Sequence, residues 1–153
     1  MPSYSQAMKA AILNDLNALV TSGVLSSVAA VDYSKFHAVE FNYPSFPSAV
    51  VLPPTVSAAE YEDQATNNRT YTWNILVVTQ PERLIGQNST ALEALVDSIL
   101  NAFDLDCTLQ GTAIGAVSAA LVEPPGPISN GSITYAAFYV VLKARQLVPA
   151  GVQ

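Results

Sequence analysis

The chain holds few residues of the types that perform catalysis or bind metal ions. Among its 153 residues, His37 is the only histidine and Cys107 is the only cysteine. A zinc site needs several His or Cys ligands at a characteristic spacing, and the segment HAVE that begins at His37 supplies no second ligand of either type. We therefore interpret His37 as a structural or exposed side chain, and Cys107 as a small buried hydrophobe in a reducing compartment.

Two groups of acidic residues suggest a cation or partner site. Asp104 and Asp106 lie at the expected end of a helix, but no glycine-containing calcium loop follows them, so we expect a solvated turn. The segment Glu60–Asp63 can either bind a basic partner or keep an edge strand from pairing with other chains, and we adopt the second interpretation. Motifs for nucleotide binding or a serine nucleophile do not occur in the sequence. We therefore expect no catalytic, cofactor-binding or metal-binding residues, and a protein that is not an enzyme.

The composition is unusual for a soluble monomer. Charged residues make up 12% of the chain, apolar residues 50%, and the mean hydropathy is +0.30. The charged fraction is about half the usual ~25%. Three classes of protein fit such a composition: a membrane protein, a secreted domain, or a subunit whose surface is largely covered by other subunits.

Two of these classes are disfavoured by the arrangement of the residues. The uncharged stretches 41–59, 107–122 and 124–142 are broken by Pro or Gly or alternate like strands, so we expect no membrane partner. The N-terminus MPSYSQAMKAAILNDL has no basic segment before an apolar core, so we expect no signal peptide. A net charge of -6 with scattered Lys and Arg disfavours direct nucleic-acid binding. Of the three classes, the one that remains is a subunit whose surface is largely covered by other subunits.

Two amphipathic helices are predicted. The first follows the possible caps Ser3 and Ser5 and ends before Gly23, and its apolar residues at helical spacing are Met8, Ala11, Ile12, Leu16, Leu19 and Val20. The second is predicted to start with a capping box formed by Thr90 and Glu93. Its apolar stripe consists of Leu92, Leu95, Val96, Ile99, Leu100 and Phe103.

The remaining segments predict a mainly antiparallel sheet. Prolines break the β-rich segment 31–54 into short or edge strands. A hairpin follows, and its second strand TYTWNILVVTQ buries one face that carries Tyr71, Trp73, Ile75 and Val77. A long C-terminal hairpin joins Thr112–Val122 to Ile133–Arg145. We thus expect one α+β domain over residues 1–153, with both helices packed on the sheet and residues 146–153 as a loose tail.

The last strand predicts contact with a neighbouring subunit. Both of its faces are apolar up to Lys143, so both must be covered, and two helices can cover only one. A second copy of the chain is an economical cover for the other face. The small residues before the hairpin tip fit such an interface, and they fit equally a strand bent under its own helix. The predicted interface residues are Gly115, Ala119, Tyr135, Tyr139 and Val141.

The tip of this hairpin, EPPGPISNGS, is far longer than the two residues that a tight turn needs. Its prolines hold the chain extended and its glycines allow the reversal, so a semi-rigid projecting finger is expected. A disordered surface loop would have a similar composition. The predicted partner-binding residues are Glu123, Pro124, Pro125, Gly126, Pro127, Ile128, Ser129, Asn130 and Gly131.

The order of these elements resembles the tail terminator, or tail-completion, proteins of long-tailed bacteriophages. The resemblance covers almost the whole chain and rests on layout, including the segments YTWNILVVTQP, STALEALVDSILNAF and ITYAAFYVVLKARQ. It implies a ring, usually of six copies, that ends the tail tube and presents the surface to which the head attaches. The implied partners are further copies of the chain, the major tail tube protein and a head-completion or connector protein. The implied location is the virion, after synthesis in the bacterial cytoplasm.

Two alternatives to a tail terminator stay open. Related neck and minor tail proteins share much of the same layout. A protein of another class, a small intracellular ligand-binding or enzymatic α+β domain, would have a pocket between sheet and helix lined by Trp73, Tyr135 and Tyr139. A stable monomer would favour this last alternative.

Overall fold

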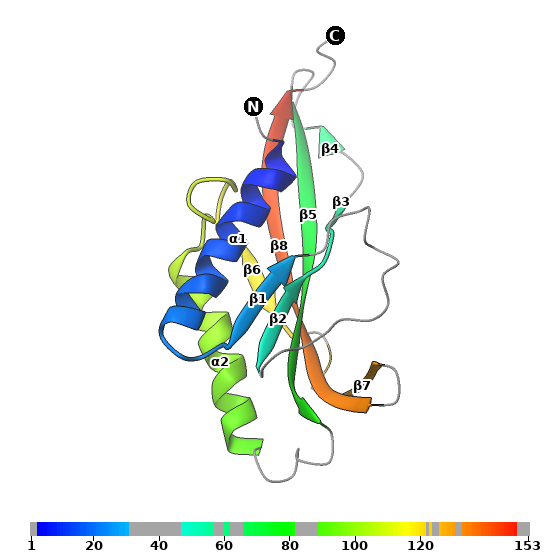
Figure 1. Cartoon of the computed structure of the whole chain (residues 1–153). Coiled ribbons are helices and arrows are strands. Elements are labelled where there is room, and N and C mark those ends of the chain that lie inside the picture. Colours follow the sequence, from blue (N-terminus) through cyan, green and yellow to red (C-terminus); the bar gives the residue numbers. More distant parts are fainter. Residues whose placement is uncertain are drawn as a thin grey trace.

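The computed structural model of the chain describes residues 3–30, 47–56, 60–61, 66–81, 89–121, 123, 126–130 and 133–149. These residues form an α+β fold of two layers, in which two helices lie on one face of a mainly antiparallel sheet (Figure 1). The predicted fold class is confirmed.

Helix α1, Tyr4–Thr21, forms where the spacing of apolar residues predicts it. Ser3 is its N-cap: the Ser3 hydroxyl accepts a hydrogen bond from the Gln6 amide, and the Gln6 side chain accepts one from the Ser3 amide. This capping box satisfies two donors that a helix start leaves unpaired. Beyond the helix, Gly23 has a φ of 87°, a conformation that glycine adopts without a steric penalty. The buried residues of α1 are Met8, Ala11, Ile12 and Leu16.

Helix α2, Ser89–Leu105, also buries the stripe that the sequence predicts. Ile99 and Phe103 are fully buried, whereas Asp97 and Asp104 on the opposite side are exposed. The predicted capping box is wrong, because Thr90 is the second residue of the helix and not the residue before it. Helices α1 and α2 contact each other, with α1 over β1 and β2 and α2 over β6.

The sheet contains eight strands among the described residues, with the central order β1-β2-β5-β8-β6. Strands β3 and β4 pair with β5, and β7 pairs with β8. Only β1 and β2 are parallel to each other; the remaining pairs are antiparallel. The strands are β1 Ser27–Ala30, β2 Ser48–Val51, β3 Thr55–Val56, β4 Glu60–Tyr61, β5 Thr66–Pro81, β6 Ser118–Ala120, β7 Gly126–Asn130 and β8 Ile133–Pro149.

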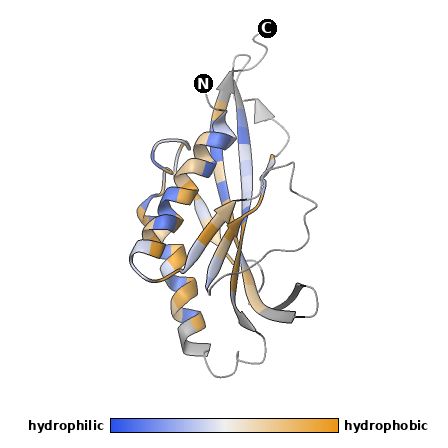
Figure 2. Cartoon of the chain, in the orientation of Figure 1, coloured by the Kyte–Doolittle hydropathy of each residue, from blue (hydrophilic) through white to orange (hydrophobic). Residues whose placement is uncertain are grey.

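Strands β5 and β8, of 16 and 17 residues, form the axis of the molecule. They pair along almost their whole length, with Trp73 opposite Leu142 and Ile75 opposite Val140, and a bulge follows Val78. Because side chains alternate along a strand, these four residues face the helices, where they are buried in one core with Phe103. Figure 2 shows hydrophobic residues in the middle of the sheet and more hydrophilic residues toward the end of β8.

Three predicted boundaries in the C-terminal half are wrong. The strand predicted over Thr112–Val122 is confined to Ser118–Ala120, because a compact loop occupies residues 106–115. Residues 146–149, predicted as loose, are the end of β8 and pair with residues 66–69 of β5. The prediction of a ten-residue hairpin tip is also wrong. Gly126–Asn130 forms β7, so only residues 131 and 132 separate β7 from β8.

Candidate interaction surface

The sheet face that turns away from both helices is the candidate functional surface, and we call it the outer face. Its side chains alternate with the core residues along β5 and β8. The pairing of the strands shows which outward side chains of neighbouring strands lie side by side in a row. In one row Val50, Leu76 and Tyr139 lie side by side, and in the next Val78 pairs with Ala137. Neither Leu76 nor Tyr139 belongs to the core that the helices cover.

The middle of the outer face is already buried within one chain. Val50, Leu76, Val78 and Ala137 are all buried although no other chain is present. These four residues therefore need no second copy of the chain to cover them, although a second copy was expected as an economical cover for this face. The uncovered part of the face begins at Tyr139.

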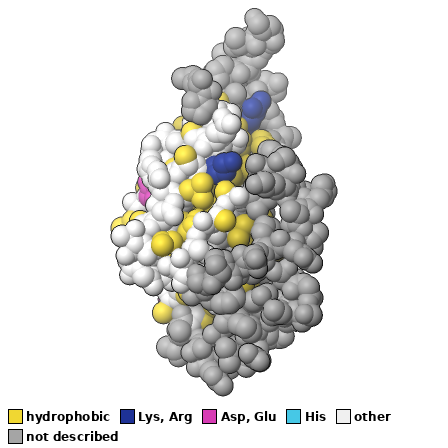
Figure 3. Space-filling model, viewed as in Figure 1, with side chains coloured by type: hydrophobic (Ala, Val, Ile, Leu, Met, Phe, Trp, Pro, Cys, Tyr) yellow, Lys and Arg dark blue, Asp and Glu magenta, His cyan; other side chains and the backbone are white. Residues whose placement is uncertain are grey.

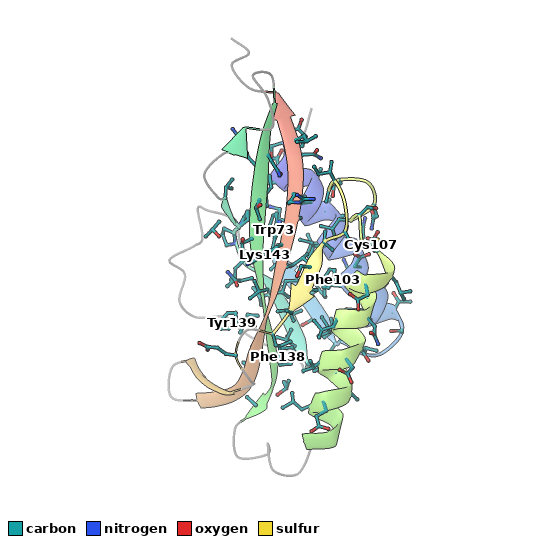
Figure 4. All side chains as sticks on the ribbon, turned by 180° about the vertical axis from the view of Figure 1, so that it is seen from behind. Trp73, Phe103, Cys107, Phe138, Tyr139 and Lys143 are labelled. Atoms are coloured by element: carbon teal, nitrogen blue, oxygen red, sulfur yellow. The ribbon has the colours of Figure 1, made fainter. Side chains whose placement is uncertain are left out.

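Among the residues whose side chains the structure describes, Tyr139 is the large aromatic residue that the outer face leaves exposed. It is 44% accessible, whereas Phe138 and Val140 on either side of it are buried. Figure 4 shows Phe138 and Tyr139 on β8 and Phe103 on α2, with Tyr139 on the side away from that helix. A partly exposed tyrosine combines a large apolar ring with a hydroxyl that can form a hydrogen bond, a combination that is common at protein interfaces.

The outer face becomes polar at Lys143 and Arg145 of β8, before the exposed Leu147. Val141, opposite Asn74, is half-buried, and Lys143, opposite Thr72, is exposed. The next outward position, Arg145, is exposed as well. The surface around Tyr139 thus has an apolar side toward Leu76 and a basic side toward Lys143.

The five residues predicted for a subunit interface do not form one surface. Tyr139 and Val141 lie on the outer face, whereas Ala119 in β6 pairs with Leu142 and packs against the helix-covered core. Gly115 lies in the 106–115 loop, where a Cβ atom would come within 3.3 Å of the Arg145 guanidinium. Tyr135 pairs with Ile128 and Pro81 through its backbone, and its side chain lies outside the described residues.

The predicted partner-binding segment is divided in a similar way. Gly126, Pro127, Ile128, Ser129 and Asn130 form β7 along the edge of β8, and Glu123 is exposed. Pro124, Pro125 and Gly131 lie outside the described residues. Strands β6 and β7 therefore border the same edge of β8, at residues 141–143 and 133–137 respectively.

The pocket required by the alternative ligand-binding function is not formed as predicted. Trp73 is buried on the helix-covered face, and Tyr139 is exposed on the outer face. A single pocket between sheet and helix cannot be lined by both side chains. The Trp73 indole Nε1 is buried and has no hydrogen-bond partner in the structure.

The residues first considered for chemistry give no site in the described part of the chain. His37 lies outside it, and the side chains of Glu60–Asp63 are not described. Cys107 is exposed, so the prediction of a buried thiol is wrong: the turn after α2 turns this side chain toward solvent. No group of three or more His, Cys, Asp or Glu residues that could hold a metal ion occurs among the described residues.

Sequence reasoning did not find a polar contact between α1 and the 106–115 loop. Gln110 contacts both Asn14 and Asp15 through its side-chain amide, although more than 90 residues separate these positions. Asp106 was weighed as a cation ligand and interpreted as a residue of a solvated turn. Neither a motif nor a local spacing links α1 to the 106–115 loop, so the sequence offers no signal for the contact between them.

Few charged side chains are visible on the described surface, as the composition predicts. Figure 3 shows hydrophobic and neutral polar side chains over the face that carries the helices, with small areas of Lys, Arg, Asp or Glu. Within the described ranges, neither α1 nor α2 has the length and hydropathy needed to cross a membrane.

Comparison of the chain with known protein families and with curated protein sequences gives no match. The resemblance to tail terminators consequently rests on the order of the elements. The fold and the outer face must supply the remaining arguments for function.

Proposed function

We propose that this chain is a structural subunit of a bacteriophage neck, a tail terminator that forms a ring on the last ring of the tail tube. In this role it ends the tube and provides the surface to which the head attaches. The observation that carries the proposal is the long β5–β8 ladder, whose outer face leaves Tyr139 44% exposed beside a buried apolar row. Such a surface suits a contact between subunits better than a site for a small molecule.

The order of the elements supports the same proposal. A capped N-terminal helix, short strands, the long strand β5, a second helix and a C-terminal hairpin follow one another as the resemblance implies. The proposed partners are further copies of the chain in a ring of six, the tail tube protein and a head-completion or connector protein. The proposal includes no enzymatic activity, no nucleic-acid or membrane partner, and a final location in the virion.

The size of an interface shows how much surface a ring would need. A stable contact buries roughly 800 Å² on each partner. Tyr139 and Val141 supply only a small part of such an area, since one aromatic side chain accounts for roughly 150–250 Å². The segment 123–131 is the proposed second contact, because β7 extends the sheet at the edge of β8.

The mass of the particle in solution tests the proposal first. Sizing chromatography with light scattering, followed by negative-stain electron microscopy, is expected to show rings that are multiples of the 16.2 kDa chain. The measurement should be repeated with purified tail tubes, because a ring can require its partner to close. A 16 kDa monomer that neither associates at high concentration nor binds tube ends would overturn the proposal.

The length of the tail distinguishes a terminator from another neck or minor tail protein. If the chain ends the tube, a phage that lacks it should produce tubes of excessive and variable length. Tubes of normal length that fail to join heads would instead indicate another neck protein. Complementation with the wild-type chain is the control for either outcome.

A further inference from the structure

Helix α1 and the 106–115 loop are joined by a small cluster of polar side chains. The Asn14 amide donates to Gln110 Oε1 at 3.2 Å, and Gln110 Nε2 donates to Asp15 Oδ1 at 3.5 Å. The backbone N–H of Gln110 donates to Asp106 Oδ1 at 2.9 Å. Gln110 therefore contacts both carboxyl groups, one on α1 and one at the start of the loop.

The backbone of the loop must be held in place at this point. Leu109 and Gln110 have φ values of 48° and 59°. These values lie in the left-handed region of the backbone, which residues other than glycine rarely adopt. The Leu109 side chain is fully buried in the main core. Packing of Leu109 and the hydrogen bonds of Gln110 thus together stabilise a backbone conformation that is unfavourable by itself.

Each of the two carboxyl groups has one oxygen that lacks a donor while both groups are ionised. Oδ2 of Asp15 and Oδ2 of Asp106 are both buried, and no N–H or O–H group in the described part of the chain donates to either of them. Two ionised carboxylates would repel each other there and leave both oxygens unsatisfied. A single proton on one carboxyl removes the repulsion and supplies a donor for the other.

We propose that Asp15 and Asp106 share one proton, and that this proton makes the contact between α1 and the 106–115 loop dependent on pH. The pair acts as a clasp: it is closed while the proton is present and weakened when both groups are ionised. This inference concerns the fold of the single chain and does not depend on the proposed function.

The environment of Asp15 agrees with a shared proton near neutral pH. Burial raises the pKa of Asp15, the hydrogen bond and the negative charge of Asp106 raise it further, and the hydrogen bond from Gln110 lowers it, so that it reaches about 7. The other charged groups on these elements are Lys9 of α1, Glu93, Asp97 and Asp104 of α2, and Lys143 and Arg145 of β8. The Arg145 guanidinium lies beside Gly115. None of these six groups is among the causes of the raised pKa.

Nuclear magnetic resonance of the intact chain tests the clasp directly. The carboxyl carbon of Asp15 is expected to titrate near pH 7, and the amide resonance of Gln110 should shift with the same midpoint. Hydrogen-exchange protection of the Leu109 and Gln110 amides, corrected for the intrinsic pH dependence of exchange, should fall by up to about tenfold per pH unit as the pH rises from about 4 to this midpoint, and should be constant above it.

Two variants separate the shared proton from other causes. Asp15→Asn keeps a donor toward Asp106 at every pH, so the corrected protection of the loop should become constant between about pH 4 and about pH 7, where that of the wild type falls. Asp106→Asn, which retains the oxygen that accepts from Gln110, is the second variant and serves also if Asp15→Asn does not fold. Asp97→Asn, at an exposed position of α2, is the matched control and should behave as the wild type.

The outcomes are distinct. An Asp15 carboxyl that titrates near pH 4 would overturn the proposal. Wild-type loop protection that is independent of pH would overturn it too, as would a pH dependence that persists in both Asn variants.

Discussion

Trp73 and Tyr139 lie on opposite faces of the same two-stranded ladder. Trp73 is opposite Leu142 and faces the helices, whereas Tyr139 is opposite Leu76 and faces outward. Two of the three rings considered for a common pocket are therefore separated by the thickness of the sheet. This relationship favours contact with a macromolecule at Tyr139 over the binding of a small molecule between Trp73 and Tyr139.

Tyr139→Lys is expected to abolish self-association of the chain while the fold is kept. A lysine on the outer face would place a charge in the proposed contact and remove the apolar ring that the contact buries. Light scattering and circular dichroism of the same samples measure the two effects separately. Asn17→Lys, which adds the same side chain at an exposed position of α1, is the control. If Tyr139→Lys associates as the wild type does, Tyr139 is not in the interface.

Ile99→Ala is expected to lower the free energy of unfolding by ~2–5 kcal/mol. Ile99 is fully buried between α2 and the sheet, so truncation leaves a cavity that the neighbouring side chains cannot fill completely. Urea denaturation of the variant and of Asp97→Ala, which changes the exposed side of the same helix, gives the comparison. Equal midpoints for the two variants would contradict the assignment of this stripe to the core.

Ser3→Ala should lower the free energy of unfolding by ~0.5–2 kcal/mol, because it removes the hydroxyl that accepts from the Gln6 amide. Ser5→Ala tests the other predicted cap. Ser5 lies inside α1, so this change is expected to have a smaller effect. Thermal unfolding followed by circular dichroism measures both variants, and a larger loss for Ser5→Ala would show that the cap is assigned to the wrong serine.

Replacement of residues 124–131 by Asn-Gly should leave the fold intact but impair assembly. The replacement removes β7 and exposes the edge of β8 at residues 133–137. Among the side chains that the structure describes, none between 122 and 137 belongs to the main core. We therefore expect a small change in Tm together with weaker self-association or failure to complete tails. Normal virion yield with the shortened chain would show that the segment is a tolerated surface element.

The stability of the protein should fall as the pH rises from about 4 to about 7, to the extent that Asp15 controls it. The folded-state pKa of Asp15 is about 7, above its ordinary value of 3.8, so the folded chain holds a proton that the unfolded chain releases in this interval. The contribution of Asp15 is therefore complete below pH 4 and lost above pH 7. Urea midpoints measured across this range should decline less in Asp15→Asn than in the wild type. Parallel declines in the two proteins would show that other groups cause the effect.

Local patterns in the sequence were sufficient to predict both helices and to predict which face of β5 is buried. The spacing of Met8, Ile12 and Leu16 predicts α1, and the alternation of Tyr71, Trp73 and Ile75 predicts which side of β5 is buried. These predictions succeed because a helix or a strand must place its apolar side chains on one face, and that requirement is visible within about ten residues.

The tertiary structure alone decided which face of β8 the helices cover, since both faces of that strand are apolar in sequence. Pairing with β5 selects Phe138, Val140 and Leu142 for the core and turns Tyr139 outward. The tertiary structure likewise decided the contact of Asp15 with the 106–115 loop, because packing brings together segments that lie more than 90 residues apart. A sequence pattern records the preference of each segment, but the partner of a segment depends on packing energies summed over the whole chain.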